Sequence, residues 1–169
     1  MKLARRHVLA AMAAVPVAGA VGSGGLALRW YDRSPADGHI MLSSDEYDFI
    51  QALSEAWMPP GGVPALSGAD ADLGTWFDEL LTQMAPNQAT LLKLFVQILD
   101  DVPLVTDAST FRGLSLARRI ELLSDWLDSS NALFRAGVSA VVVLIGMGWT
   151  THPTVAAVLA PRFRCGWSR

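Results

Sequence analysis

The sequence holds a single cysteine, Cys165, among 169 residues. One cysteine excludes an internal disulfide framework, a Cys-x-x-Cys redox pair and a zinc site built from several thiolates. The three histidines, His7, His39 and His152, are spaced too widely to indicate a histidine-rich metal centre. Charged residues make up only 17% of the chain, whereas 51% of its residues are hydrophobic. This composition predicts a compact, apolar domain rather than a disordered chain.

Motifs that would identify a cofactor enzyme are also missing. The glycine cluster at residues 22–25 follows no predicted strand and lacks the Gly-x-Gly-x-x-Gly spacing of a dinucleotide site. No Cys-x-x-Cys-His or His-Glu-x-x-His motif occurs. The 13 basic and 16 acidic residues give a net charge of −3, and phosphate binding requires a basic face instead. We therefore expect no catalytic residue, cofactor or metal in this chain, and no nucleic-acid partner.

The N-terminus has the pattern of an export signal. Arg5 and Arg6 directly precede an uncharged stretch rich in alanine, which ends in small residues at Ala18–Ala20. The paired arginines resemble a twin-arginine signal, which directs already folded proteins across the bacterial inner membrane. We therefore expect the twin-arginine translocase to recognise Arg5 and Arg6 and to deliver the chain to the periplasmic side. The alternative is an ordinary secretory signal that contains two arginines.

Cleavage of this signal after Ala20 is the preferred interpretation. It would change the net charge from −3 to −6, because it removes three basic residues and no acidic one. Retention as a membrane anchor is the alternative, since residues 8–28 form 21 uncharged positions, about the length that crosses a bilayer. The predicted divisions are a signal or anchor over 1–28, a linker over 29–42, a helical domain over 43–160 and a tail over 161–169.

The helical domain is predicted to be all-α, because apolar residues recur at spacings of three and four and no alternating strand pattern stands out. Ser43 and Glu46 have the spacing of a capping box, and Pro59 must end the helix that they begin. Six helices are expected after the signal, and they begin near Ser43, Ser67, Pro86, Ser115, Asn131 and Pro153.

The fifth of these helices is expected to lie at the centre of the fold. From Val138 to Trp149 it has no charged side chain, and a helix that is apolar all round is typically buried on every side. Twelve such residues are too few to cross a bilayer. In the third helix the apolar spacing predicts an inward-facing stripe that consists of Leu91, Leu94, Phe95, Ile98 and Val102.

The remaining polar residues are given structural interpretations. His39 lies in the linker and is expected to be solvated, while His152 precedes Pro153 and is expected at a helix start. Asp100 and Asp101 close the third helix. They are predicted to form a solvated pair, although carboxylates at a helix C-terminus could also indicate a cation or an arginine partner.

The tail combines aromatic and basic residues beyond the last predicted helix. Protein interfaces are enriched in aromatic residues and arginine, so the tail is predicted to dock on a partner, and a disordered end is the alternative. Cys165 is interpreted as a partner-facing thiol rather than a nucleophile, because no histidine lies next to it in sequence. The possible contact residues are Phe163, Arg164, Cys165 and Trp167.

Several segments resemble the gluconate 2-dehydrogenase subunit 3 family. Residues 42–59, with the sequence LSSDEYDFIQALSEAWMP, are similar to the opening of that family. Four further motifs follow in the same order: SGAD at 67–70, FRGLS at 111–115, ALFR at 132–135 and THPTV at 151–155.

The resemblance implies a noncatalytic small, or gamma, subunit of a membrane-associated flavin dehydrogenase. Its partner would be a large FAD-containing subunit of the glucose-methanol-choline type, which oxidises a sugar, sugar acid, sterol or other alcohol. A cytochrome c subunit often accepts the electrons in such complexes. The small subunit would supply the twin-arginine signal and help the large subunit mature. The alternatives are a membrane-anchored binding or structural protein without a flavoprotein, and a standalone exported enzyme.

Overall fold

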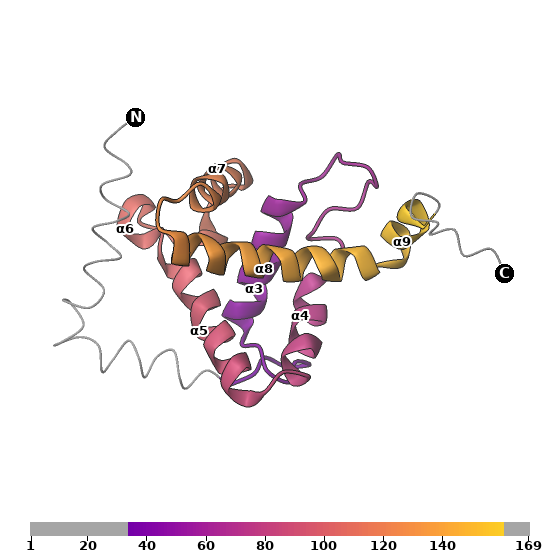
Figure 1. Ribbon diagram of the computed structural model, residues 1–169, viewed down its shortest axis with the longest axis horizontal. Coiled ribbons are helices and arrows are strands. Elements are labelled where there is room, and N and C mark those ends of the chain that lie inside the picture. Colours follow the sequence, from indigo (N-terminus) through magenta and orange to yellow (C-terminus); the bar gives the residue numbers. More distant parts are fainter. Residues whose placement is uncertain (1–33, 161–169) are drawn as a thin grey trace.

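The computed structural model describes residues 34–160, and these residues form helices without any strand, as predicted (Figure 1). Six helices correspond to those expected from the sequence, and a single-turn helix and a 3-10 turn lie between the third and fourth of them. The elements are α3 (Ser44–Trp57), α4 (Leu73–Thr82), α5 (Pro86–Asp101), α6 (Leu104–Asp107), η1 (Phe111–Gly113), α7 (Leu116–Leu127), α8 (Ala132–Thr151) and α9 (Pro153–Leu159).

The predicted signals define most helix ends. The capping box is present, since the Ser43 side chain accepts from the Glu46 backbone and the Glu46 side chain accepts from the Ser43 backbone. The Ser115 side chain accepts from the backbone of Arg118, and the Asn131 side chain caps α8 in the same way. The second helix differs from its prediction, because Ser67 forms a turn with Asp70 and α4 begins only at Leu73.

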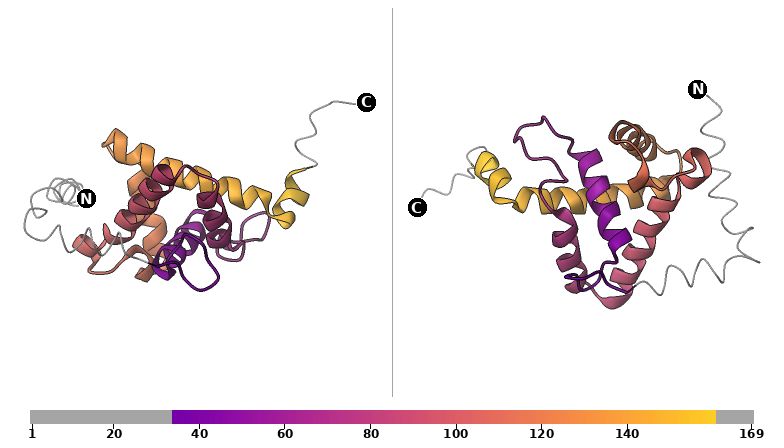
Figure 2. Two further views of the ribbon diagram at one scale, coloured as in Figure 1. Left: turned by 90° about the horizontal axis from the view of Figure 1, so that it is seen from below. Right: turned by 180° about the vertical axis from the view of Figure 1, so that it is seen from behind.

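Helix α3 is the centre of the fold, which corrects the expectation that α8 would be. It contacts α4, α5, α7, α8 and η1, and half of its residues are buried. In Figure 1, α8 runs across α3 at a steep angle, and the two further views show it on one side of the layer formed by α3, α4 and α5 (Figure 2). One face of α8 therefore remains outside the core.

A cluster of aromatic side chains joins the elements around α3. The Phe111 ring lies 5.4 Å from Phe49 of α3 and 5.2 Å from Trp126 of α7. Phe134 of α8 contacts Trp126 and Phe95 of α5 edge to face. Such pairs contribute about 0.5–1.5 kcal/mol each beyond the burial of their area, so they fix how α5, α7 and α8 sit on α3.

Helix α5 is rotated relative to its predicted inward face. Leu91 and Ile98 are 65% and 37% exposed, whereas Gln97 and Asp100 are buried. The physical reason is that polar side chains on this face bind buried groups of other elements, as described below. The predicted stripe is therefore wrong for Leu91 and Ile98, whereas Phe95 and Val102 pack against the core as expected.

The glycines of α8 provide a test of this packing. A Cβ at Gly148 would lie 2.6 Å from the Trp76 ring, whereas a Cβ at Gly146 would meet nothing nearer than Trp57 at 4.0 Å. Replacing Gly148 by Ala should destabilise the domain by about 1–3 kcal/mol, because the added methyl overpacks the contact with α4. The matched variant Gly146→Ala should stabilise it by about 0.5–1 kcal/mol, because glycine costs conformational entropy in a helix. Urea unfolding of both variants measures the difference, and equal effects would contradict this packing of α8.

Candidate functional site

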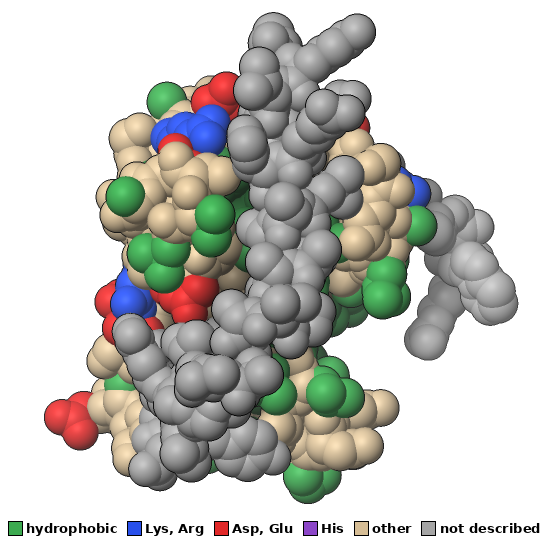
Figure 3. All heavy atoms as spheres, turned by 90° about the vertical axis from the view of Figure 1, so that its left-hand side faces the viewer, with side chains coloured by type: hydrophobic (Ala, Val, Ile, Leu, Met, Phe, Trp, Pro, Cys, Tyr) green, Lys and Arg blue, Asp and Glu red, His purple; other side chains and the backbone are tan. Residues whose placement is uncertain are grey.

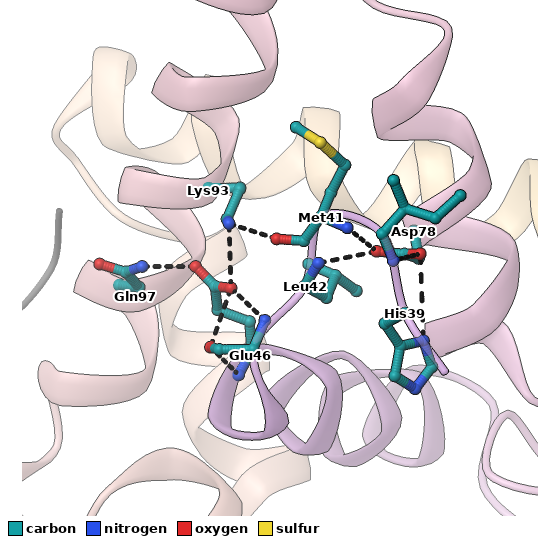
Figure 4. Close-up of polar contacts among 9 residues, drawn as sticks. His39, Met41, Leu42, Glu46, Asp78, Lys93 and Gln97 are labelled. Carbon is teal, nitrogen blue, oxygen red and sulfur yellow. Dashed lines mark hydrogen bonds and ion pairs between the residues drawn. The ribbon is translucent and has the colours of Figure 1, made fainter. Parts of the chain in front are cut away.

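The most extensive buried polar cluster holds the segment that leads into α3. Asp78 of α4 accepts hydrogen bonds from three consecutive backbone N–H groups, those of Ile40, Met41 and Leu42, at 2.7–2.8 Å (Figure 4). Burial alone would raise the pKa of Asp78, but the three donors outweigh burial and hold this pKa below its usual range. One carboxylate therefore satisfies three donors of a segment that has no helix or strand of its own.

Glu46 of α3 anchors the same segment from the other side. It is 1% exposed, and its carboxylate accepts from the backbone of Ser43 at 2.7 Å and from the side chain of Gln97. Lys93 Nζ lies 3.4 Å from the Glu46 carboxylate and donates to the carbonyl of Met41 (Figure 4). Lys93 and Gln97 both belong to α5, which explains why this polar face of the helix turns inward.

The cavity beside Glu46 and Gln97 is small. It lies between α3 and α5 and has a volume of about 10 Å³. A single water molecule needs about 10–15 Å³. The carboxylates of Glu46 and Asp78 are engaged by the groups described above, and the cluster holds the segment that leads into α3 against α4 and α5.

A second cluster joins the end of α5 to η1 and corrects the interpretation of Asp100. Asp100 is buried and not solvated, and it accepts from the Arg112 backbone at 3.1 Å. The Arg112 guanidinium lies 3.5 Å from Asp100 and also binds Asp45 of α3. The alternative of an arginine partner is therefore correct for Asp100. Burial raises its pKa despite the neighbouring guanidinium.

The two described histidines have different outcomes. His39 is half-buried rather than fully solvated as expected, since its ring lies 4.6 Å from the Tyr47 ring and its Nδ1 lies 4.0 Å from the Asp78 carboxylate. Burial and a hydrogen bond to Asp72 raise the pKa of Tyr47 to about 12, so this phenol stays protonated at neutral pH. His152 is the N-cap of α9, as predicted, and its Nδ1 accepts from the Thr154 backbone at 3.3 Å.

The open surface feature of the domain is an apolar groove between the end of α3 and the C-terminal half of α8. Its volume is about 440 Å³, and its walls include Trp57, Met58, Val143, Met147 and Trp149. The spacing of four residues between Val143 and Met147 could have indicated a shared face. Sequence analysis missed the groove because it assigned all of α8 to the core.

Elsewhere the exposed hydrophobic side chains are more scattered. The view from the side of α6 and α7 shows several separate hydrophobic groups, with acidic and basic groups beside some of them (Figure 3). Leu91 on α5 and Val105 on α6 belong to the exposed hydrophobic residues that do not line the groove. Single exposed hydrophobic residues are normal on protein surfaces and need no partner to explain them.

The residues predicted to carry function lie outside the described part of the chain. These are Arg5 and Arg6 of the signal and the tail residues Phe163, Arg164, Cys165 and Trp167. Within residues 34–160, no group of three or more His, Cys, Asp or Glu side chains is placed to hold a metal ion. In the same range, α8 is long and apolar enough to cross a membrane, but core helices also meet that criterion.

The chain matches no protein-family model, no curated protein and no solved structure. Its resemblance to gluconate 2-dehydrogenase subunit 3 therefore remains a prediction from the sequence motifs.

The anchor formed by Asp78 yields a prediction about stability. Replacing Asp78 by Asn should lower the free energy of unfolding by about 2–4 kcal/mol near neutral pH, because backbone donors lose a charged acceptor. The folded-state pKa of Asp78 is depressed, so its contribution is present above the unfolded pKa and is lost as the pH falls through the folded pKa. The difference between the two proteins should therefore shrink below about pH 4. Urea unfolding across this pH range measures it.

Asp37 provides the control, because it lies in the same segment and its side chain is exposed. Asp37→Asn should change the free energy of unfolding by less than about 0.5 kcal/mol. A similar loss of stability in both variants, or a pH-independent loss in Asp78→Asn, would contradict the anchoring of residues 40–42 by an ionised Asp78.

Proposed function

We propose that this chain is the noncatalytic small subunit of an exported, FAD-dependent dehydrogenase of the glucose-methanol-choline type. It supplies the twin-arginine signal for a large catalytic subunit that binds the flavin and oxidises a sugar, sugar acid, sterol or other alcohol. It also stabilises the large subunit during maturation. A cytochrome c subunit receives the electrons on the periplasmic side, where the complex associates with the membrane.

The observation that carries this proposal is the arginine pair at Arg5 and Arg6 in front of a weakly hydrophobic stretch. Such a signal directs proteins that fold before export. A small domain without a cofactor does not itself require that route, whereas a flavoprotein that travels with it does. The ordered motifs between residues 42 and 155 support the same assignment by their resemblance to small subunits of this kind.

The chemistry of the described residues is compatible with a binding protein. The carboxylates of Glu46, Asp78 and Asp100 are engaged in contacts that hold helices and the incoming segment together. The apolar groove beside α8, by contrast, leaves Val143 and Met147 open to solvent. Apolar groups that are exposed in an isolated subunit are the material from which permanent interfaces are built.

A second candidate is a membrane-anchored exported protein without a flavoprotein partner. The observation that favours it is the run of 21 uncharged residues over 8–28, which has the length of a membrane span. The two candidates differ in what accompanies the chain. Affinity purification of the tagged chain from its native host, with an absorbance spectrum for flavin and haem, separates them. A flavin spectrum with dehydrogenase activity supports the small-subunit proposal, and its absence supports the second candidate.

The signal gives a direct prediction about the location of both subunits. Changing Arg5 and Arg6 together to Lys should leave this chain and the flavoprotein in the cytoplasm. The lysine pair keeps the positive charge but loses the guanidinium groups, and the two side chains are not equivalent in recognition. Fractionation of periplasm and cytoplasm, with immunoblots and flavin-dependent activity, measures the distribution of each subunit.

The matched control replaces Arg29 and Arg33 by Lys, which makes the same chemical change outside the signal motif. This variant should be exported normally. Normal export of the flavoprotein alongside the Arg5→Lys, Arg6→Lys variant would rule out the proposal that this chain carries the signal for both.

A further inference from the structure

Helix α8 has a second apolar face, which lies away from its contacts with α3, α4 and α7. Figure 2 shows α8 on one side of the layer formed by α3, α4 and α5, so the opposite side of the helix is open. Six exposed residues form what we call the outer face of α8, and they are Leu133, Ala136, Ala140, Val143, Met147 and Thr150. The sequence from residue 136 to residue 151 contains no ionisable side chain. The outer face therefore offers apolar area that water solvates poorly.

The spacing of the outer face indicates a helix as its occupant. Its residues recur at intervals of three and four along the whole of α8, which is the spacing of a seam between two packed helices. From Leu133 to Thr150 this seam extends for about 26 Å. A loop or a single inserted side chain would contact only one end of such a seam, whereas a second helix would cover all of it.

The seam is complementary to itself when α8 of a second copy lies antiparallel to it. A two-fold axis midway between Ala140 and Val143 places Ala140 of each copy opposite Val143 of the other. The same axis places Ala136 of each copy opposite Met147 of the other. Small residues then face large ones at both levels, so the two helices can approach closely and leave no voids between them. In a parallel pair, by contrast, alanine would face alanine and methionine would face methionine.

The antiparallel arrangement also brings an exposed side chain to the groove. It places Leu133 of the second copy opposite Thr150, which lines the groove together with Gly146 and Met147. Leu133 is 85% exposed, more than the other large hydrophobic side chains of residues 34–160. Gly146 has no side chain to fill the space at this end of the seam. Because the axis is two-fold, each copy would insert one leucine into the groove of the other.

Charge and area determine how tightly two copies associate. Residues 34–160 contain 15 acidic and five basic side chains, a formal charge of −10, so two copies repel each other. A seam about 26 Å long and one helix diameter of about 10 Å wide has a footprint of roughly 260 Å². Standard interfaces bury about 800 Å² on each partner. The association is therefore expected to be weak and concentration-dependent, and to strengthen at high salt, which screens the repulsion.

We propose that the outer face of α8 forms a reversible homodimer, in which α8 of a second copy packs antiparallel to it about a two-fold axis between Ala140 and Val143. The observation that carries this inference is the match of small and large residues across the axis, together with Leu133 opposite the groove. A lipid surface would also accept apolar side chains, but it would not require their alternation in size. The inference concerns two copies of this chain and is independent of the proposed function.

Sedimentation velocity of the purified full-length chain, from about 1 to about 500 µM and at low and high salt, measures the association. The wild type should form a dimer whose fraction rises with concentration and with salt. Val143→Glu combined with Met147→Glu should weaken the association about tenfold or more, because it places charges of one sign in an apolar contact. Leu133→Ala should weaken it severalfold without introducing a charge, because the groove of the other copy stays empty.

Leu91→Glu is the matched control, since Leu91 is an exposed apolar residue of α5 and lies outside the outer face of α8. It should leave the association unchanged. Circular dichroism and thermal melting of each variant establish that the domain is folded.

Cysteine crosslinking tests the antiparallel arrangement directly. Residue 136 of one copy would face residue 147 of the other, whereas the two copies of either residue would lie about 16 Å apart along the seam. A disulfide requires Cα atoms within about 7 Å of each other. Ala136→Cys and Met147→Cys are therefore made in separate chains, each with Cys165→Ser, and are oxidised alone and as a mixture. Only the mixture should give a crosslinked dimer.

Several outcomes would overturn the proposal. A wild-type chain that stays monomeric up to about 500 µM excludes the dimer. A dimer that persists in the folded Val143→Glu, Met147→Glu variant, or that Leu91→Glu weakens equally, excludes the outer face of α8 as its interface. Crosslinking of either cysteine variant alone contradicts the antiparallel arrangement. A monomeric wild type that binds phosphatidylglycerol vesicles or a flavoprotein, and loses this binding in the Val143→Glu, Met147→Glu variant, would assign the face to lipid or to that protein instead.

Discussion

Burial of two carboxylates, Glu46 and Asp78, determines how the first helices of this domain come together. Asp78 accepts hydrogen bonds from the backbone of residues 40–42, and Glu46 accepts them from the Ser43 backbone and the Gln97 side chain of α5. Burying a carboxylate costs free energy unless its oxygens accept hydrogen bonds. Helix α4 must therefore place Asp78 beside the backbone of residues 40–42, and α5 must place Lys93 and Gln97 beside Glu46. This requirement fixes the entry of the chain into the domain, which is where the predicted linker from the export signal ends.

The helix ends could be predicted from sequence because their causes are local. Ser43 with Glu46, Ser115 and Asn131 each satisfy backbone groups within three residues, and the proline at position 86 needs no distant partner to begin α5. The rotation of α5 could not be predicted in this way. Its determinant is a set of bonds from Lys93 and Gln97 to groups 51 and 52 residues away in sequence, and these outweigh the apolar spacing.

The same distinction explains why the groove was missed. Helix α8 has apolar residues on both faces, and its contacts with α3, α4 and α7 decide which face is buried. The apolar composition of α8 predicts that the helix is buried on every side. In the structure, only 33% of an 18-residue apolar stretch of α8 is buried. The signal residues and the tail residues could be selected from sequence because their pattern is contiguous. The walls of the groove come from segments that lie more than 80 residues apart.

An isolated domain with these properties balances two opposing features. Its formal charge of −10 over residues 34–160 opposes association with other copies through repulsion, while the groove beside α8 offers apolar area that water solvates poorly. A polar residue at position 143 or 147 would reduce the apolar surface of the groove. Neither substitution would disturb the core, because both side chains are exposed. Gly146 could likewise carry a side chain without a clash. The packing of the core therefore requires neither apolar side chains at positions 143 and 147 nor a glycine at position 146.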